Sequence, residues 1–169
     1  VKNLQRAPKV VNVSFELRRG EVLGLTGLIG AGRTEAARLI FGADRSTGGE
    51  IRVAGKKVDI RSPQDAVRHG ICLLPEDRKG QGLVLGRSVR ENFGLPNLNQ
   101  LRRGPFIDEA LERKKFAQFH ESLSIRVPSS ETAASSLSGG NQQKIVLAKW
   151  LERETEIVIF DEPTRGIDV

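Results

Sequence analysis

A short glycine-rich stretch constrains the fold of this chain more than any other feature of its sequence. Residues 27–35 read GLIGAGRTE and stand between an apolar run, residues 22–26, and a helix-like segment that continues to Gly42. Glycines at such a junction let the backbone turn tightly and aim several N–H groups at one point, where the dipole of the following helix favours anions. The stretch therefore predicts a phosphate site in an α/β fold, and glycines placed for packing alone are the competing interpretation.

The seventh residue of this stretch departs from the usual pattern of nucleotide-binding loops. Arg33 stands where such a loop normally has lysine, so a planar fork replaces a compact ammonium. Thr34 follows the cation, and its hydroxyl can coordinate the Mg²⁺ that bridges the terminal phosphates of a nucleotide. The expected nucleotide-binding residues of the stretch are Gly27, Gly30, Ala31, Gly32, Arg33, Thr34 and Glu35.

A second candidate site lies at the end of the run EIVIFDEP. Residues 157–160 are apolar and predict a buried strand whose carboxyl end presents Asp161 and Glu162. Because ligands of open α/β sheets bind at that edge, we expect Asp161 to hold Mg²⁺ through water, together with Thr34. Glu162 is the candidate to polarise an attacking water, so Asp161 and Glu162 are the candidate catalytic residues. The alternative is two solvated acids at an ordinary strand end, and the glycine loop earlier in the chain favours the catalytic interpretation.

The third candidate site is the stretch LSGGNQQK, residues 137–144. Ser138 and the two glycines after it predict the start of a helix, which is another place where an anion can bind. A plain helix N-cap with flexible glycines is the alternative, but the stretch lies shortly before the acidic strand in a chain that already has a phosphate loop. The expected binding residues here are Ser138, Gly139, Gly140 and Asn141.

The remaining patterns predict strands that alternate with helices. Apolar and polar residues alternate around Val11, Val13, Phe15 and Leu17, which indicates a strand that leads into a second one over residues 22–26. Further predicted elements are a hairpin turning at Gly55, a helix capped by Ser62, a strand over 71–75, helical signals from about Ser88 to Leu123 with Asp108 opening one helix, and a helix after Ser138. This order predicts a mainly parallel sheet covered by helices, with an antiparallel start and a helical middle added to it.

Composition narrows the class of protein. The 169 residues carry a formal net charge of +6, but their lysines and arginines are scattered and few aromatic residues accompany them, which disfavours a nucleic-acid partner. Cys72 is the single cysteine, so no disulfide can form within the chain, and its apolar surroundings predict a buried residue. No run reaches the roughly 20 apolar residues of a membrane span, and the N-terminus lacks the apolar core of a signal peptide. A cytoplasmic location is therefore expected.

The three candidate sites, in this order, resemble those of the ATP-binding cassette (ABC) ATPases. LSGGNQQK is similar to the signature motif of that family, IVIFDEP to its Walker B strand, and RGIDV to its D-loop, with Asp168 in the matching place. GLIGAGRTE, PEDRKGQGL, LSGGNQQK and DEPTRG together resemble the second, C-terminal cassette of bacterial sugar-importer ATPases of the ribose, galactose and xylose type. Those ATPases carry two cassettes in one polypeptide.

The resemblance implies an α/β fold of the P-loop NTPase class. It implies a mainly parallel core sheet, an N-terminal antiparallel β subdomain and an inserted helical subdomain. Residues 1–169 would form one partial nucleotide-binding domain, in which 1–84 and 137–169 belong to the ATPase core with its β subdomain and about 85–136 to the helical subdomain. The chain is expected to be a fragment that is truncated in its C-terminal part.

The resemblance also implies the ligands and partners. ATP and Mg²⁺ would be the cofactors, and each ATP would be held between the Walker motifs of one cassette and the signature of another. The partners would be a second cassette, membrane-spanning permease subunits and a periplasmic sugar-binding protein, with the chain peripheral to the cytoplasmic face of the inner membrane and no nucleic acid bound.

Two departures from the family pattern shape the mechanism that we expect. Arg33 replaces the loop lysine, and Glu76, also expected near the nucleotide, stands in the place of the Q-loop glutamine. We therefore expect the chain's own Walker site to turn over slowly or not at all, while its signature serves the site of a partner cassette. The alternatives are a regulatory half that binds nucleotide without hydrolysis and an ABC ATPase that acts on nucleic acid instead of transport.

Overall fold

The computed structural model describes residues 1–153 and 155–163, which fall into two compact units. The first unit combines Val1–Leu73 with Glu156–Asp161, and the second begins at Leu74, continues to Thr155 and includes Glu162 and Pro163. The two units each contain α-helix and β-strand, so the α/β class is confirmed. The predicted boundaries between an ATPase core and a helical subdomain stay a prediction.

An antiparallel sheet of four strands opens the first unit, with the strand order β2-β1-β3-β4. Its strands are β1 (Lys2–Arg6), β2 (Val10–Val13), β3 (Gly48–Val53) and β4 (Lys56–Val58). The hairpin predicted at Gly55 is confirmed, because Val53 pairs with Lys56 and Gly55 has the positive φ, +77°, that such a turn requires. The predicted antiparallel start of the fold is therefore present.

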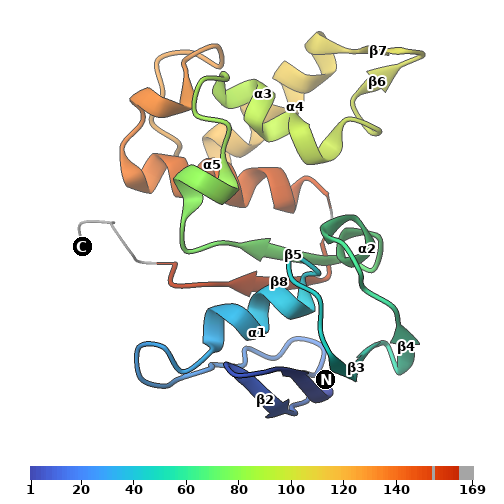
Figure 1. Cartoon of the computed structure of the whole chain (residues 1–169). Helices are drawn as coiled ribbons and strands as arrows, with labels where there is room; N and C mark the ends of the chain where they lie inside the picture. Colours follow the sequence, from blue (N-terminus) through green and yellow to red (C-terminus); the bar gives the residue numbers. More distant parts are fainter. Residues whose placement is uncertain (154, 164–169) are drawn as a thin grey trace. The chain divides into compact units, whose positions relative to one another are not determined.

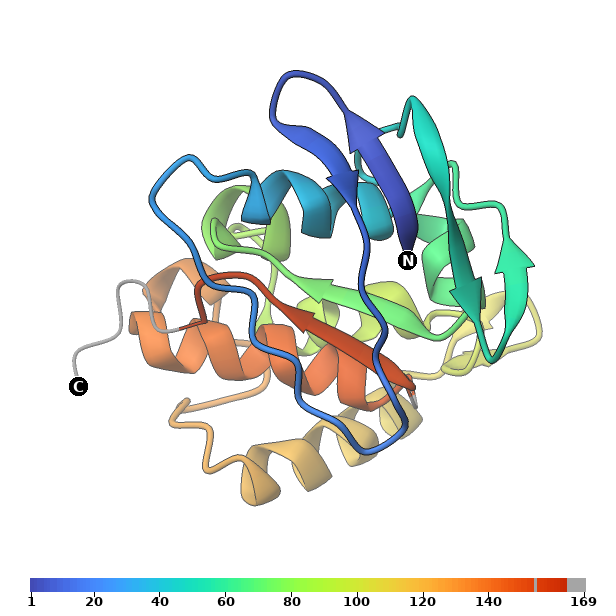
Figure 2. The same ribbon diagram turned by 90° about the horizontal axis from the view of Figure 1, so that it is seen from below.

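Helix α1 (Arg33–Ile40) lies between this sheet and a second, two-stranded sheet (Figures 1 and 2). It buries Ala36, Ala37, Leu39 and Ile40, and Gly42 follows it with φ +72°. Helix α2 (Pro63–Arg68) begins as predicted at Ser62, whose hydroxyl oxygen accepts a hydrogen bond from the Asp65 N–H at 3.3 Å.

The second sheet pairs β5 (Ile71–Leu74) with β8 (Ile157–Phe160), and the two arrows point in the same direction in both views (Figures 1 and 2). The sequence predicts both strands, and β5 is buried as expected, but β8 is not: its first three residues are half-buried and Phe160 is 51% exposed. The Gly70 carbonyl oxygen accepts hydrogen bonds from the N–H groups of Glu156 and Ile157, at 3.0 and 2.9 Å. Cys72 is fully buried in β5, as its apolar surroundings predict.

The strand predicted over residues 22–26 is wrong, and the preceding strand is shorter than predicted. Residues 14–32 contain no helix or strand, and Figure 2 shows them as a long irregular loop that leads into α1. Val22 is 96% exposed, and Val11 in the preceding strand is 65% exposed. An apolar run becomes a strand only where a neighbouring strand supplies hydrogen bonds and a surface to pack on, and the described residues supply neither to this run.

The second unit is mainly helical. It contains η1 (Arg78–Gly82), α3 (Val89–Gly94), η2 (Leu95–Asn97), the hairpin β6 (Arg102–Arg103) and β7 (Phe106–Ile107), α4 (Glu109–Ser122), η3 (Ala134–Ser136) and α5 (Gly139–Leu151). Helix α4 begins as predicted at Asp108, whose carboxylate accepts from the Leu111 N–H at 3.0 Å. Phe93 of α3 packs against Phe116 and Phe119 of α4, with ring centroids 5.7 and 5.5 Å apart.

A buried arginine joins α3 to α4 inside this unit. Arg90 donates through Nη1 to the buried Glu112 carboxylate and through Nε to Glu131 Oε1 at 2.8 Å. The guanidinium of Arg90 holds the pKa of Glu131 down at about 2, whereas burial raises the pKa of Glu112. The two carboxylates pair with the positive charge of Arg90, which would be unfavourable if it were buried without a partner.

Candidate nucleotide-binding site

The glycine loop ends at a residue that only glycine can fill. Gly32 is buried, has φ +84° and occupies the N-cap position of α1. A Cβ atom built on Gly32 would overlap the backbone carbonyl oxygen of Lys9. Gly30 has a similar φ, +82°, but no atom lies within 4 Å of the Cβ that it lacks. The left-handed backbone at both positions turns the loop into the helix start.

Thr34 and Asp161, the two predicted metal ligands, lie together in the first unit. The Thr34 hydroxyl donates to Asp161 Oδ1 at 3.0 Å, although the two residues are 127 positions apart. Asp161 follows β8 directly and is only 8% exposed. A hydroxyl and a carboxylate are oxygen donors of the kind that Mg²⁺ prefers, so this pair fits that ion at the end of the glycine loop.

Lys9 is a neighbour of the loop that the sequence reasoning missed. Its ammonium contacts Glu35 Oε1 at 2.5 Å, across 26 positions of sequence. The hydrogen bond from Lys9 is the main reason that the pKa of Glu35 lies below its ordinary value. No motif marks Lys9, because the contact depends on how the turn between β1 and β2 reaches α1. The pair adds one positive and one negative charge beside the predicted phosphate site.

Two other predicted residues, Glu162 and Glu76, come shortly after the two strands of the second sheet. Glu162, the candidate catalytic base, is exposed and has a positive φ of +48°, which is uncommon for a residue with a side chain. Glu76 is half-buried shortly after β5 and belongs to the second unit. Asp168 lies outside the described residues. The roles of these residues, like those of the loop, stay predictions.

The stretch around Ser138 begins α5 in the second unit. Ser138 occupies the N-cap position as predicted, but its side chain accepts no capping hydrogen bond from the helix backbone. Its hydroxyl oxygen instead accepts from the Asn141 amide at 3.0 Å, and Asn141 Oδ1 accepts from the Arg126 N–H at 2.7 Å. Gly139 and Gly140 form the first turn of α5. The exposed Ser138 hydroxyl therefore lies at the start of the helix, where the Asn141 side chain holds it.

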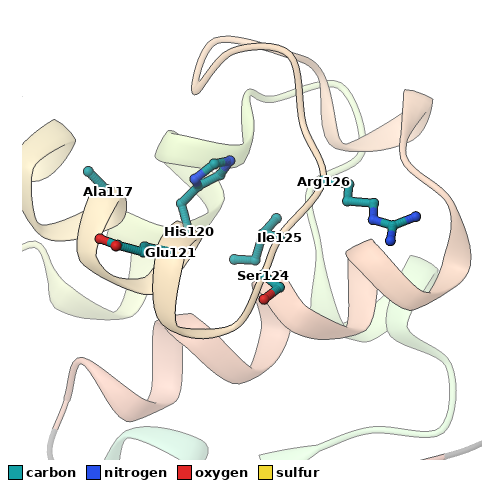
Figure 3. A pocket seen from close by; sticks show the side chains of 6 residues that line it. All are labelled: Ala117, His120, Glu121, Ser124, Ile125 and Arg126. Carbon is teal, nitrogen blue, oxygen red and sulfur yellow. The ribbon is translucent and has the colours of Figure 1, made fainter.

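A pocket of about 490 Å³ lies elsewhere in the second unit, at the C-terminal end of α4. Figure 3 shows the side chains that line it, with His120 and Arg126 on opposite sides of Ile125. None of the predicted nucleotide-binding residues lines it. The full lining is Ala117, His120, Glu121, Ser124, Ile125 and Arg126.

Two absences hold for the described residues alone. In residues 1–153 and 155–163, no group of three or more histidine, cysteine, aspartate or glutamate side chains is placed to hold a metal ion by itself. The same residues contain no helix that is long and apolar enough to cross a membrane.

Comparisons with known proteins place the chain in a family. A family model described as ABC transporter matches residues 10–165. A putative ribose/galactose/methyl galactoside import ATP-binding protein of Burkholderia lata is 55% identical over all of this chain, and a ribose import ATP-binding protein of Bacillus cereus is 47% identical. The chain spans about a third of the length of these curated relatives, 33% and 34%.

Solved structures agree on the fold. A dimeric ATP-binding cassette in a post-hydrolysis state, bound to ADP and Pi, superposes with a TM-score of 0.77 at 22% identity. The match covers 99% of this chain and 74% of that one. The family model, which matches residues 10–165, shows that the chain belongs to the ABC transporter family.

Proposed function

We propose that this chain is an ATP-binding domain of a bacterial ABC importer for monosaccharides, in which ATP binding and hydrolysis drive sugar uptake. The names of the relatives support sugar import, since they are described as ribose and galactose import ATP-binding proteins. The importer would bring a second cassette, permease subunits and a periplasmic sugar-binding protein, with this chain at the cytoplasmic face of the inner membrane.

The proposal of nucleotide binding rests on the hydrogen bond between Thr34 and Asp161. Their oxygens converge at the end of the glycine loop, where the backbone of residues 27–33 turns into α1. Bound there, Mg²⁺ would neutralise charge on the terminal phosphates of ATP. Loop N–H groups would bind the phosphate oxygens, and Glu162 would orient an attacking water.

We further propose that the two nucleotide sites to which the chain contributes are unequal. Arg33 offers a planar fork where phosphoryl transfer in this family uses a compact ammonium, and Glu76 is a carboxylate where the family pattern has the Q-loop glutamine. Loss of one well-placed contact to the transferring phosphate typically lowers the rate on the order of a hundred-fold. The stretch Ser138–Asn141, by contrast, would complete the site of a partner cassette.

The ATPase rate of the assembled transporter tests this assignment. Ser138→Arg should abolish hydrolysis, because it fills the helix end that would face the partner's nucleotide. Arg33→Ala should change the rate by less than about three-fold if this site contributes little turnover. Ser135→Arg is a matched control on the exposed η3 turn and should leave the rate unchanged.

The ranking of the variants decides between the functions. If Arg33→Ala abolishes hydrolysis and Ser138→Arg does not, the proposal of unequal sites is overturned. If the paired cassettes bind ATP tightly but show no turnover, a regulatory nucleotide-binding half replaces it.

A further inference from the structure

The hairpin β6–β7 of the second unit exposes large apolar side chains. All six residues from 102 to 107 are exposed, and Figure 1 shows the hairpin projecting from the helices of its unit. Phe106 is 75% exposed and Ile107 is 40% exposed. A two-stranded hairpin of this size is marginal in water, and exposed apolar side chains add to the cost. Contact with an apolar environment would therefore stabilise it.

The hairpin is also positively charged. Arg102 and Arg103 form β6, and residues 92–107 contain no aspartate or glutamate. Within the part of the chain that the structure describes, neither guanidinium takes part in an ion pair. The charge is therefore available to an anionic partner.

The pairing of the two strands places an arginine and an apolar side chain on each face. Arg102 lies opposite Ile107, and Arg103 lies opposite Phe106. Cross-strand partners share a face of the hairpin, so its two faces are alike. A protein partner would contact one face and leave the other in water. The headgroup region of a bilayer would surround an inserted hairpin on all sides. It would therefore contact the arginine and the apolar side chain on both faces at once.

The chain before the hairpin extends the same surface. Leu95 and Leu98 are 45% and 44% exposed, and they precede a turn that the Leu101 N–H closes on the Asn97 carbonyl at 3.1 Å. Asn97 is fully buried and donates to the Lys149 carbonyl at 2.8 Å, which anchors the base of the segment on α5. We call residues 95–107 the basic apolar loop.

We propose that the basic apolar loop binds the surface of a membrane that carries anionic lipids. The two arginines would lie among the phosphate headgroups, with Phe106 and Ile107 at the boundary of the acyl chains. The contact with the membrane requires no nucleotide, so this proposal can be tested independently of the proposed ATPase function.

Cosedimentation of the protein with vesicles tests the proposal. The protein should bind vesicles of phosphatidylcholine mixed with phosphatidylglycerol, and it should bind pure phosphatidylcholine far more weakly. A basic residue near an anionic surface strengthens binding roughly five-fold, so Arg102→Glu with Arg103→Glu should weaken it at least about twenty-five-fold. Phe106→Ser should weaken it roughly ten-fold through lost apolar burial.

Matched variants separate the loop from the charge of the whole chain. Lys56→Glu with Lys57→Glu makes the same charge change on the β3–β4 hairpin, which carries two exposed lysines. Val11→Ser removes an apolar side chain that is 65% exposed on β2. Both controls should retain most of the binding. Circular dichroism of each variant checks that it folds.

Three results would overturn the proposal. The first is no binding to anionic vesicles by a folded protein. The second is an equal loss from the Lys56 and Lys57 reversals, which would assign the binding to net charge. The third is a photoreactive group at position 106 that labels a protein and no lipid in native membranes, which would make the loop a protein-docking surface.

Discussion

Gly32 illustrates how two independent requirements can fix one residue. Its φ of +84° favours glycine, and the Lys9 carbonyl fills the space where a side chain would begin. Gly30 meets the first requirement only, because its missing Cβ faces open space. The two glycines of the same loop therefore have different tolerance to substitution.

Replacing each glycine by alanine should separate the two requirements. Gly30→Ala should lower the free energy of unfolding by about 1–2 kcal/mol, the cost of a left-handed backbone with a side chain. Gly32→Ala should cost roughly 1–3 kcal/mol more, because the new methyl group overlaps the Lys9 carbonyl. Urea unfolding of both variants measures the difference. Equal losses would mean that the Lys9 carbonyl does not restrict this position.

Lys149 should make stability depend on pH in the alkaline range. Its ammonium is buried in α5 and donates to the Gly82 carbonyl oxygen, and burial lowers its pKa from 10.5 to about 8. Between those values the unfolded chain binds more protons than the folded one, so the free energy of unfolding should rise with pH. The free energy of unfolding is therefore highest above pH 10.5. It decreases by up to roughly 3 kcal/mol as the pH falls to about 8.

Denaturant unfolding at a series of pH values measures this dependence. The chain has no tyrosine, so no phenol titrates in the same window. Lys149→Met should remove most of the slope, because it removes the titrating group. Lys115→Met changes a lysine that is 41% exposed and paired with Glu152, and it should keep the slope. A slope that survives in Lys149→Met would assign the titration to another group.

Sequence reasoning located the single residues that belong to motifs. The glycine loop and the acidic strand name Thr34 and Asp161, and the structure places their oxygens 3.0 Å apart. Lys9 and Lys149 could not be found in that way. Their contacts, to Glu35 and to Gly82, join segments far apart in the chain, and no local pattern records which loop meets which helix.

At the scale of elements, Arg90 holds α3 and α4 together. Its partners Glu112 and Glu131 come from α4 and from the segment after it. Arg90→Leu would leave the Glu112 carboxylate buried without its cation, which typically costs about 3–5 kcal/mol. Arg87→Leu is the matched control, since Arg87 is 66% exposed and its pair with Glu91 should contribute less than about 1 kcal/mol. Thermal unfolding of both variants measures the contrast, and similar losses would contradict the role of Arg90.

Elements with end signals were predictable, and the strand without a partner was not. Ser62 and Asp108 cap the starts of α2 and α4 with side-chain hydrogen bonds, which act within one turn of the chain, and Ser138 stands at the start of α5 without such a bond. The run over residues 22–26 has the apolar composition of a buried strand, yet strand formation requires a neighbour that the local sequence does not specify.

At the scale of the whole molecule, bound nucleotide should raise thermal stability. Mg²⁺ with ATP at about one hundred times its dissociation constant would add about 2.7 kcal/mol to the free energy of unfolding. Thr34→Val should lose most of this gain, because the variant lacks the hydroxyl beside Asp161. Thr47→Val removes a hydroxyl that donates to the Gln5 carbonyl and should keep the gain. Differential scanning calorimetry with and without ligand compares them, and equal gains in both variants would place the metal elsewhere.

The discontinuity of the first unit has a consequence for biosynthesis. Residues 156–161 supply β8 and Asp161 to a unit whose other residues end at Leu73. The ribosome therefore synthesises nearly all of the second unit before the first unit can add its last strand, β8. The second unit can fold while the chain is still growing, and β5 waits for its partner strand until synthesis has passed Phe160.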